Sequence, residues 1–308
     1  MKPVTDDLRH RLFPSMPTPF DGGGKLHQEG LERMIASMSI RAVGGVSVAG
    51  PVGRGVPLAT PERAEILQSW RAGLGSSGWL IVPVGVPPTT RRPDDVIKTV
   101  RMEANEAASL GADVLLAIPP GSFRGRPDRD RLILDYHAAV AEPGRPILAS
   151  YRREVAGGVS YGPELIAQLM ARPEVLGIEV STLDGIATFQ QLAALIHEQS
   201  PGKLVLSGEE RFLGYSLMSG ADAALVGMGA AYPAEVIELI ESHFAGKSER
   251  FLKASAILDS LSRDIYRAPL ERSTFRLLRA MVESGILPAE AACEHPGESS
   301  RSRPIALE

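Results

Sequence analysis

The sequence is poor in the residues on which several classes of protein depend. Its 308 residues include one cysteine, Cys293, which excludes an intrachain disulfide framework or a cysteine-rich metal site and suits a reducing compartment. The net charge is −4, and Lys and Arg form no runs, so nucleic acid and anionic membrane surfaces are unsuitable partners. The most hydrophobic window, Trp79–Val86, is far shorter than a membrane span. No apolar segment follows the acidic N-terminus, and we expect a cytoplasmic protein.

Apolar strand candidates alternate with helix candidates along most of the chain. The strand candidates are Leu12–Thr18, Val43–Ala49, Leu80–Val84, Val114–Ile118, Ile147–Tyr151, Val175–Ser181, Leu204–Ser207 and Ala223–Val226. The helix candidates are Gln28–Ser39, a segment that begins at Thr60, Asp94–Leu110, Asp128–Val140, Gly162–Met170, Ile186–His197, Arg211–Ser219 and Pro233–Ala245. Eight such units predict a (β/α)8 barrel. An open dinucleotide-binding sheet is disfavoured, since no G-x-G-x-x-G follows the first strand.

The chain continues beyond the eighth unit. Ser248–Tyr266 and Leu270–Gly285 both have helical apolar spacing. The last stretch, Glu294–Glu308, is rich in Pro, Ser and Arg, which is typical of a loosely held tail. We therefore predict a barrel over residues 1–246, a C-terminal helical extension over 247–293 and a flexible tail over 294–308.

Val175–Ser181 carries the strongest functional signal. It is an apolar run that turns polar at Glu179 and Ser181, as expected of a buried parallel strand with a carboxylate at its C-terminal end. In alternating β/α proteins, side chains at the strand C-termini converge on the active site. The sequence therefore predicts a functional site around Glu179.

Several short motifs accompany this strand in a fixed order. They are Pro17–Asp21, Gly44–Gly53, Gly111–Asp113 before Pro119 and Pro120, Gly177–Glu179, Leu206–Glu210 and Gly220–Asp222. Together they resemble the dihydrodipicolinate synthase/N-acetylneuraminate lyase family, and the resemblance extends from Phe13 to about Leu287.

This resemblance implies a homotetrameric class I aldolase-type lyase on a (β/α)8 barrel. In the family, a lysine at the end of the sixth strand forms a Schiff base with pyruvate or another 2-keto acid. A tyrosine from the fifth strand relays protons, and a Gly-Thr-Thr-Gly loop after the second strand holds the keto-acid carboxylate. We expect neither a cofactor nor a metal.

The chain departs from the family pattern at its catalytic positions. The lysine position is Glu179, and a carboxylate cannot condense with a ketone to form an iminium. Pro51 and Val52 replace the two threonines of the loop, and Arg54 replaces the acidic residue that follows it. Tyr151 keeps the spacing before Glu179 that is expected of the family tyrosine.

We predict Glu179 and Tyr151 as base and acid in a pocket for a small 2-oxo or hydroxy carboxylate, without a Schiff base. The predicted substrate-binding residues are Gly50, Pro51, Val52, Arg54, Arg124, Arg152, Gly208, Val226 and Gly227. If the strand phase is displaced by one residue, Ser150 takes the inward place of Tyr151.

Four alternatives stay open at this point. An ion pair between Glu179 and an arginine would fill a pocket that no longer works. Glu179 with Glu209 and Glu210 would suit a divalent cation. A relocated lysine would restore the family chemistry, although Lys203, for example, precedes its strand instead of ending it. Finally, the chain would serve as a non-catalytic scaffold that binds a ligand or assembles as a dimer or tetramer.

Overall fold

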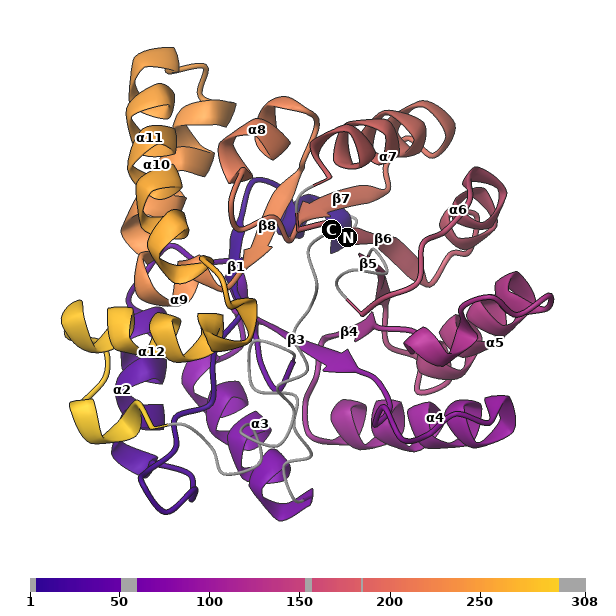
Figure 1. Cartoon of the computed structure of the whole chain (residues 1–308), viewed down its shortest axis with the longest axis horizontal. Helices are drawn as coiled ribbons and strands as arrows, with labels where there is room; N and C mark the ends of the chain where they lie inside the picture. The colour runs from indigo at the N-terminus through magenta and orange to yellow at the C-terminus, as the bar shows by residue number, and fades with distance from the viewer. Residues whose placement is uncertain (1–3, 51–59, 153–156, 184, 294–308) are drawn as a thin grey trace. The chain divides into compact units, whose positions relative to one another are not determined.

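The computed structural model of the chain describes residues 4–50, 60–152, 157–183 and 185–293. Its eight strands form one sheet in the order β1-β8-β7-β6-β5-β4-β3-β2, and helices alternate with them along the chain (Figure 1). This is the (β/α)8 barrel class, followed by C-terminal helices, and it confirms the fold predicted from the alternating pattern.

The strands closely follow the apolar runs of the sequence. They are β1 (Leu12–Pro14), β2 (Gly45–Ser47), β3 (Trp79–Val84), β4 (Val114–Ala117), β5 (Ile147–Arg152), β6 (Val175–Ser181), β7 (Leu204–Ser207) and β8 (Ala223–Val226). The last three have the predicted bounds. The first two are shorter than predicted.

The helices carry the expected apolar spacing. They are α1 (Val4–Leu8), α2 (Gln28–Ser39), α3 (Thr60–Leu74), α4 (Pro93–Ser109), α5 (Arg129–Ala141), α6 (Pro163–Met170), α7 (Ile186–Gln199), α8 (Leu213–Met218), α9 (Met228–Ala231), α10 (Pro233–Phe244), α11 (Ser248–Ile265) and α12 (Ser273–Glu283). Three 3-10 turns are η1 (Gly121–Phe123), η3 (Leu270–Arg272) and η4 (Ala289–Ala291). The one-turn helices α1 and α9 were not predicted, and the predicted helix from Leu270 starts as η3.

The chain divides into two compact units. One comprises the residues up to Arg9 and Ile81–Ala224, and the other comprises His10–Leu80 and the residues from Leu225 onward. This division is not the one predicted along the chain between residues 246 and 247, which stays a prediction.

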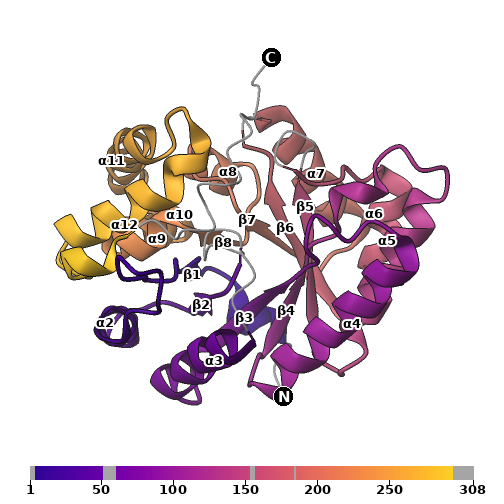
Figure 2. The same ribbon diagram turned by 60° about the horizontal axis from the view of Figure 1, so that its bottom comes forward.

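The first unit contains most of the strands that bear on the candidate site. Strands β4, β5, β6 and β7 pair in parallel, and α4, α5, α6 and α7 run alongside them (Figure 2). Ile178 and Val180 of β6 have no exposed surface, as expected for parallel strands buried on both faces. The pairing of Tyr151 with Val180, and of Val180 with Ser207, brings the carboxyl ends of β5, β6 and β7 side by side.

The second unit is mainly helical around β1 and β2. Within it α2 packs on α3, α10 on α11, and α12 on α9. Among the described residues, no helix is both long and apolar enough to cross a membrane.

Candidate functional site

The register of β5 and β6 decides which side chains meet Glu179. Ser150 pairs with Glu179, and Tyr151 pairs with Val180. Because successive side chains of a strand point to opposite faces, Ser150 and Glu179 share one face and Tyr151 belongs to the other. Ser150 was the alternative left open by the sequence. The structure therefore places Ser150, on β5, next to Glu179 on the same face of the sheet.

The Glu179 carboxylate is buried and accepts hydrogen bonds from two hydroxyls. Ser150 Oγ donates to Oε2 at 2.6 Å, and Ser181 Oγ donates to Oε1 at 2.7 Å. Glu179 is 2% exposed. Within the described ranges no arginine is close enough to form an ion pair with it. Hydroxyl groups therefore satisfy this carboxylate, and the alternative of an ion pair with an arginine finds no partner among the described residues.

Gly208, directly after β7, lies against the Glu179 carboxylate. Its backbone N–H donates to Val180 O at 2.9 Å. A Cβ atom at this position would overlap Glu179 Oε1 and Ser181 Oγ. The position therefore requires glycine because of a close approach between backbone and carboxylate.

Glu209 supplies a second buried carboxylate at the neighbouring strand end. The backbone N–H of Thr182 donates to Glu209 Oε1 at 2.6 Å, and Glu209 is 1% exposed. Burial, reinforced by the nearby charge of Glu179, raises the pKa of Glu209 from 4.5 to about 7 despite the hydrogen bonds from Thr182. The two glutamates thus differ in environment, a feature of acid–base pairs in enzymes.

Glu209 is the residue that the sequence analysis missed as an acid. It entered there as one member of a metal site. The available signal was its place immediately after a strand in Gly208–Glu209–Glu210. Among the described residues, no group of three His, Cys, Asp or Glu side chains is arranged to hold a metal ion.

A buried tyrosine, Tyr161, lies beside Ser150. Tyr161 donates its hydroxyl hydrogen to the Ser150 carbonyl oxygen at 2.7 Å, and its ring meets the Tyr151 ring edge to face, with centroids 5.6 Å apart. Burial and the nearby Glu179 charge raise the pKa of Tyr161 well above its ordinary value. Tyr161 is therefore a neutral support of β5, and the sequence analysis did not single it out.

The predicted arginines have separate partners. Arg152 Nε lies 3.3 Å from Ser150 Oγ, which links a half-buried guanidinium to the hydroxyl that holds Glu179. Arg124 Nε donates to the Gly158 carbonyl oxygen at 2.7 Å. The structure thus brings Arg152 to the Glu179 group and uses Arg124 to fix the turn at Gly158.

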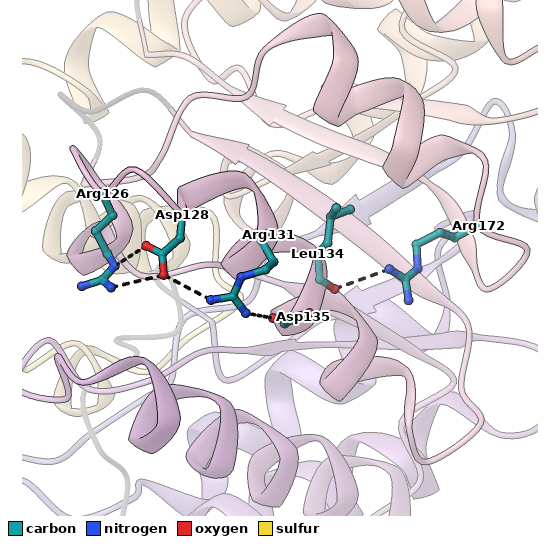
Figure 3. A network of polar contacts seen from close by, with 6 residues as sticks. All are labelled: Arg126, Asp128, Arg131, Leu134, Asp135 and Arg172. Carbon is teal, nitrogen blue, oxygen red and sulfur yellow. Dashed lines mark hydrogen bonds and ion pairs between the residues drawn. The ribbon is translucent and has the colours of Figure 1, made fainter.

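Other arginines of this unit form exposed ion pairs near the start of α5 (Figure 3). Arg126 Nε contacts Asp128 Oδ1 at 2.9 Å, and Arg131 bridges Asp128 and Asp135 at 3.2 and 2.9 Å. The hydrogen bond from Arg126 lowers the pKa of Asp128 below its usual value. Such exposed pairs contribute little to stability. These arginines therefore form surface ion pairs of α5 and do not contact the Glu179 group.

Comparison with known proteins decides the lineage. The sequence profile of the dihydrodipicolinate synthetase family matches residues 9–301. The chain belongs to the dihydrodipicolinate synthetase family. Its aldolase-type lyase lineage is the one that the short motifs of the sequence indicate.

Relatives in this family agree with that placement. The chain is 28% identical over 219 residues to the 4-hydroxy-tetrahydrodipicolinate synthase of Stenotrophomonas maltophilia (strain K279a), covering 71% of this chain and 68% of the relative. It is 25% identical over 232 residues to the probable mitochondrial 4-hydroxy-2-oxoglutarate aldolase of Emericella nidulans, covering 74% and 71%. A prophage protein of E. coli K12 from the dihydrodipicolinic acid synthase family, solved with pyruvate, superposes with a TM-score of 0.79 and 19% identity over 96% of this chain and 93% of that one. At that identity the superposition supports the fold.

In this family member Lys203 lies at the opposite end of β6 from Glu179. Lys203 Nζ donates to the carbonyl oxygens of Val175 at 2.5 Å and Arg172 at 2.9 Å. Val175 precedes Glu179 by four residues, which corresponds to roughly 13 Å along a strand. Lys203 therefore ties the amino end of the strand and does not reach the Glu179 group.

The remaining predicted residues of this family member lie elsewhere. Pro51, Val52 and Arg54 fall outside the described residues. Gly50, Val226 and Gly227 belong to the second compact unit; the Val226 carbonyl oxygen there accepts the N–H of Ser15 at 3.0 Å. Their substrate-binding roles stay predictions.

Proposed function

We propose that this protein acts on a small 2-oxo or hydroxy carboxylate by acid–base chemistry, with Glu179 as proton acceptor and Glu209 as proton donor. The observation that carries the proposal is a pair of buried carboxylates at neighbouring strand ends, one held by hydroxyls and the other by a backbone N–H. The substrate class is taken from the family and its relatives.

The family's Schiff-base route does not suit these residues. Position 179 is a glutamate, and a carboxylate cannot form an iminium with a ketone. Lys203, which is half-buried and directly precedes β7, donates to the carbonyl oxygens of Arg172 and Val175 at the amino end of β6. A relocated lysine at this site therefore has no support from the described lysines.

Proton transfer beside a carbonyl needs no covalent intermediate. The ionised Glu179 removes a proton from the carbon next to the ketone, and the C–H electron pair forms a carbon–carbon double bond. The carbonyl electron pair moves to oxygen, which takes the proton of Glu209. The products are the enol, a protonated Glu179 and an ionised Glu209, and the enol is the nucleophile that an aldol addition uses.

Neighbouring residues supply the supporting roles. Arg152 lies half-buried beside Ser150, where a guanidinium can pair with the substrate carboxylate in a bidentate manner. The acid role expected of Tyr151 from the family position stays a prediction, since the register assigns its side chain to the other face of the sheet. Gly208 keeps the Glu179 carboxylate in place through its close approach.

Deuterium exchange tests the proton transfer directly. Pyruvate and 2-oxobutyrate are incubated with the protein in D₂O, and the loss of the C3 proton signal is followed by NMR. We expect exchange well above the rate without protein, and a fall of at least about 100-fold in Glu179→Gln. Glu198→Gln, on the exposed face of α7, is the matched control. Exchange that persists in Glu179→Gln overturns the role of Glu179.

Borohydride trapping separates this chemistry from a Schiff base. The protein is incubated with the same keto acids, reduced and weighed intact. We expect no mass gain, while a lysine-bearing family member treated alongside gains the mass of the reduced adduct. A gain that maps to one lysine overturns the proposal in favour of the family reaction.

A second candidate is a binding or assembly scaffold without turnover. The low exposure of Glu179 and Glu209 favours it, because a fully satisfied buried network also stabilises a fold without reacting. Saturable binding of a keto acid without deuterium exchange would assign this role. We further propose a cytoplasmic homo-oligomer, dimer or tetramer, which light scattering after size-exclusion chromatography distinguishes from a monomer.

A further inference from the structure

The second compact unit contains a cavity of about 630 Å³ formed by α11, η3 and α12, with Tyr232 at its edge. Its volume lies in the range of small-molecule sites. Six of its thirteen lining residues are charged. They are Arg267, Arg272, Arg276, Arg279, Asp264 and Glu283.

The charges of this lining do not cancel. Four guanidiniums and two carboxylates leave an excess of two positive charges. Within the described part of the chain, neither Asp264 nor Glu283 forms an ion pair with an arginine. Burial, with Arg267 and Arg272 nearby, lowers the pKa of Arg276, which places these like charges close together. Like charges in a concave site concentrate a field that attracts an anion.

One of the four arginines builds the wall of the cavity. Arg276 donates from Nη1 to the carbonyl oxygens of Ile265 at 2.7 Å and Arg267 at 2.6 Å, and from Nη2 to that of Pro269 at 2.9 Å. It therefore satisfies the C-terminal end of α11 and fixes the backbone that leads to η3. A ligand in the cavity would therefore contact backbone that Arg276 already holds in place.

The other guanidiniums sit around this wall. Arg272 lies over the Phe275 ring, with Cζ 5.7 Å from the centroid. Arg267 and Arg279 are exposed, and their guanidinium groups form no hydrogen bond or ion pair with other described residues. They offer planar forks of N–H donors, the geometry that matches phosphate oxygens.

We propose that this cavity binds a small organic phosphate, whose dianionic group is held by Arg267, Arg279 and Arg272 and whose body lies against Phe275 and Tyr232. The excess of two positive charges matches a phosphate monoester dianion. Its three terminal oxygens accept from several guanidiniums, whereas a carboxylate offers two oxygens and one charge. The aromatic rings suit a planar body.

Calorimetric titration tests this site with phenyl phosphate and inorganic phosphate at constant ionic strength. We expect saturable binding, tighter for phenyl phosphate. The double variant Arg267→Gln/Arg279→Gln should lose at least about tenfold in affinity for both probes. Phe275→Leu should reduce the preference for phenyl phosphate.

Matched controls keep the outcome decisive. Arg263→Gln removes an exposed arginine of α11 that pairs with Asp259 at 2.7 Å outside the cavity, and it should leave both affinities unchanged. Glu179→Gln should also leave them unchanged, which separates this inference from the proposed function. Equal loss in Arg263→Gln, or no saturation by either probe, overturns the site. If the two probes bind with equal affinity and Phe275→Leu alters neither, the proposal of an organic body on the ligand is wrong. The cavity is then assigned to free phosphate.

Discussion

Ser150 and Glu179 meet across the β5–β6 pair, with the serine Oγ donating to Glu179 Oε2 at 2.6 Å. Ser181 holds the other carboxylate oxygen at 2.7 Å. The carboxylate is therefore stabilised by neutral hydroxyl donors on two strands. Among the described residues, no guanidinium forms an ion pair with it.

Removing the Ser150 hydroxyl should destabilise the fold. Ser150→Ala leaves a buried carboxylate with one donor fewer, and we expect a loss of about 1–3 kcal/mol in the free energy of unfolding, measured with urea. Ser260→Ala, on an exposed position of α11, should change it by less than about 0.5 kcal/mol. Because the loss acts through Glu179, it should shrink in a Glu179→Gln background; an equal loss there contradicts this explanation.

Glu209 should make stability depend on pH around neutrality. Its pKa is raised from 4.5 to about 7 in the folded state by burial, so the folded protein holds this proton more tightly than the unfolded chain. The contribution is fully present below pH 4.5 and is lost as the pH rises to about 7. It amounts to at most about 3 kcal/mol. Urea denaturation of wild type and Glu209→Gln between pH 5 and 8 measures it.

A second buried group, His137, also makes stability depend on pH and is present in both proteins of that series. Burial lowers the pKa of His137 from 6.5 to about 4, so its contribution to stability is lost on acidification, in the opposite sense. The difference between wild type and Glu209→Gln isolates Glu209, because His137 is common to both. A difference that does not change with pH would show that Glu209 titrates normally.

Gly208→Ala should disturb the Glu179 carboxylate more than its small volume suggests. The added methyl group overlaps Glu179 Oε1 and Ser181 Oγ, and we expect a loss of about 1–3 kcal/mol in stability, together with loss of deuterium exchange. Gly162→Ala is the matched control, since a Cβ there meets its nearest atom, Glu164 Oε2, at 3.6 Å. Equal behaviour of the two variants would contradict the close approach.

Lys203→Met should weaken the fold without affecting the chemistry. It removes the donor to two carbonyl groups at the start of β6, and we expect a loss of about 1–3 kcal/mol in the free energy of unfolding. Lys98→Met, on the exposed side of α4, should be nearly neutral. The rate of deuterium exchange per folded molecule should equal that of wild type. A large fall in that rate would return Lys203 to the candidate site.

The fold was predictable because its pattern is local. The buried parallel strands are mainly apolar runs, and β6, β7 and β8 have the predicted bounds. The one-turn helices α1 and α9 are too short to have an apolar period. The start of α12 depends on the turn η3, which periodicity does not specify.

The site was predictable in position but not in partners. The polar end of β6 identifies Glu179 from the sequence. Whether Ser150 or Tyr151 faces it depends on the register between β5 and β6, which no short segment determines. The role of Glu209 depends on burial and on the backbone N–H of Thr182, neither of which is visible in a run of residues.

The close seat of Gly208 on the Glu179 carboxylate also constrains how this lineage can change. A side chain at position 208 overlaps both Glu179 Oε1 and Ser181 Oγ, so it requires changes at positions 179 and 181 together. A lysine at 179 would meet the same glycine and the two serine hydroxyls, which would then accept hydrogen bonds instead of donating them. An amine at this position is therefore compatible with both serines only after each hydroxyl has rotated its hydrogen away from residue 179.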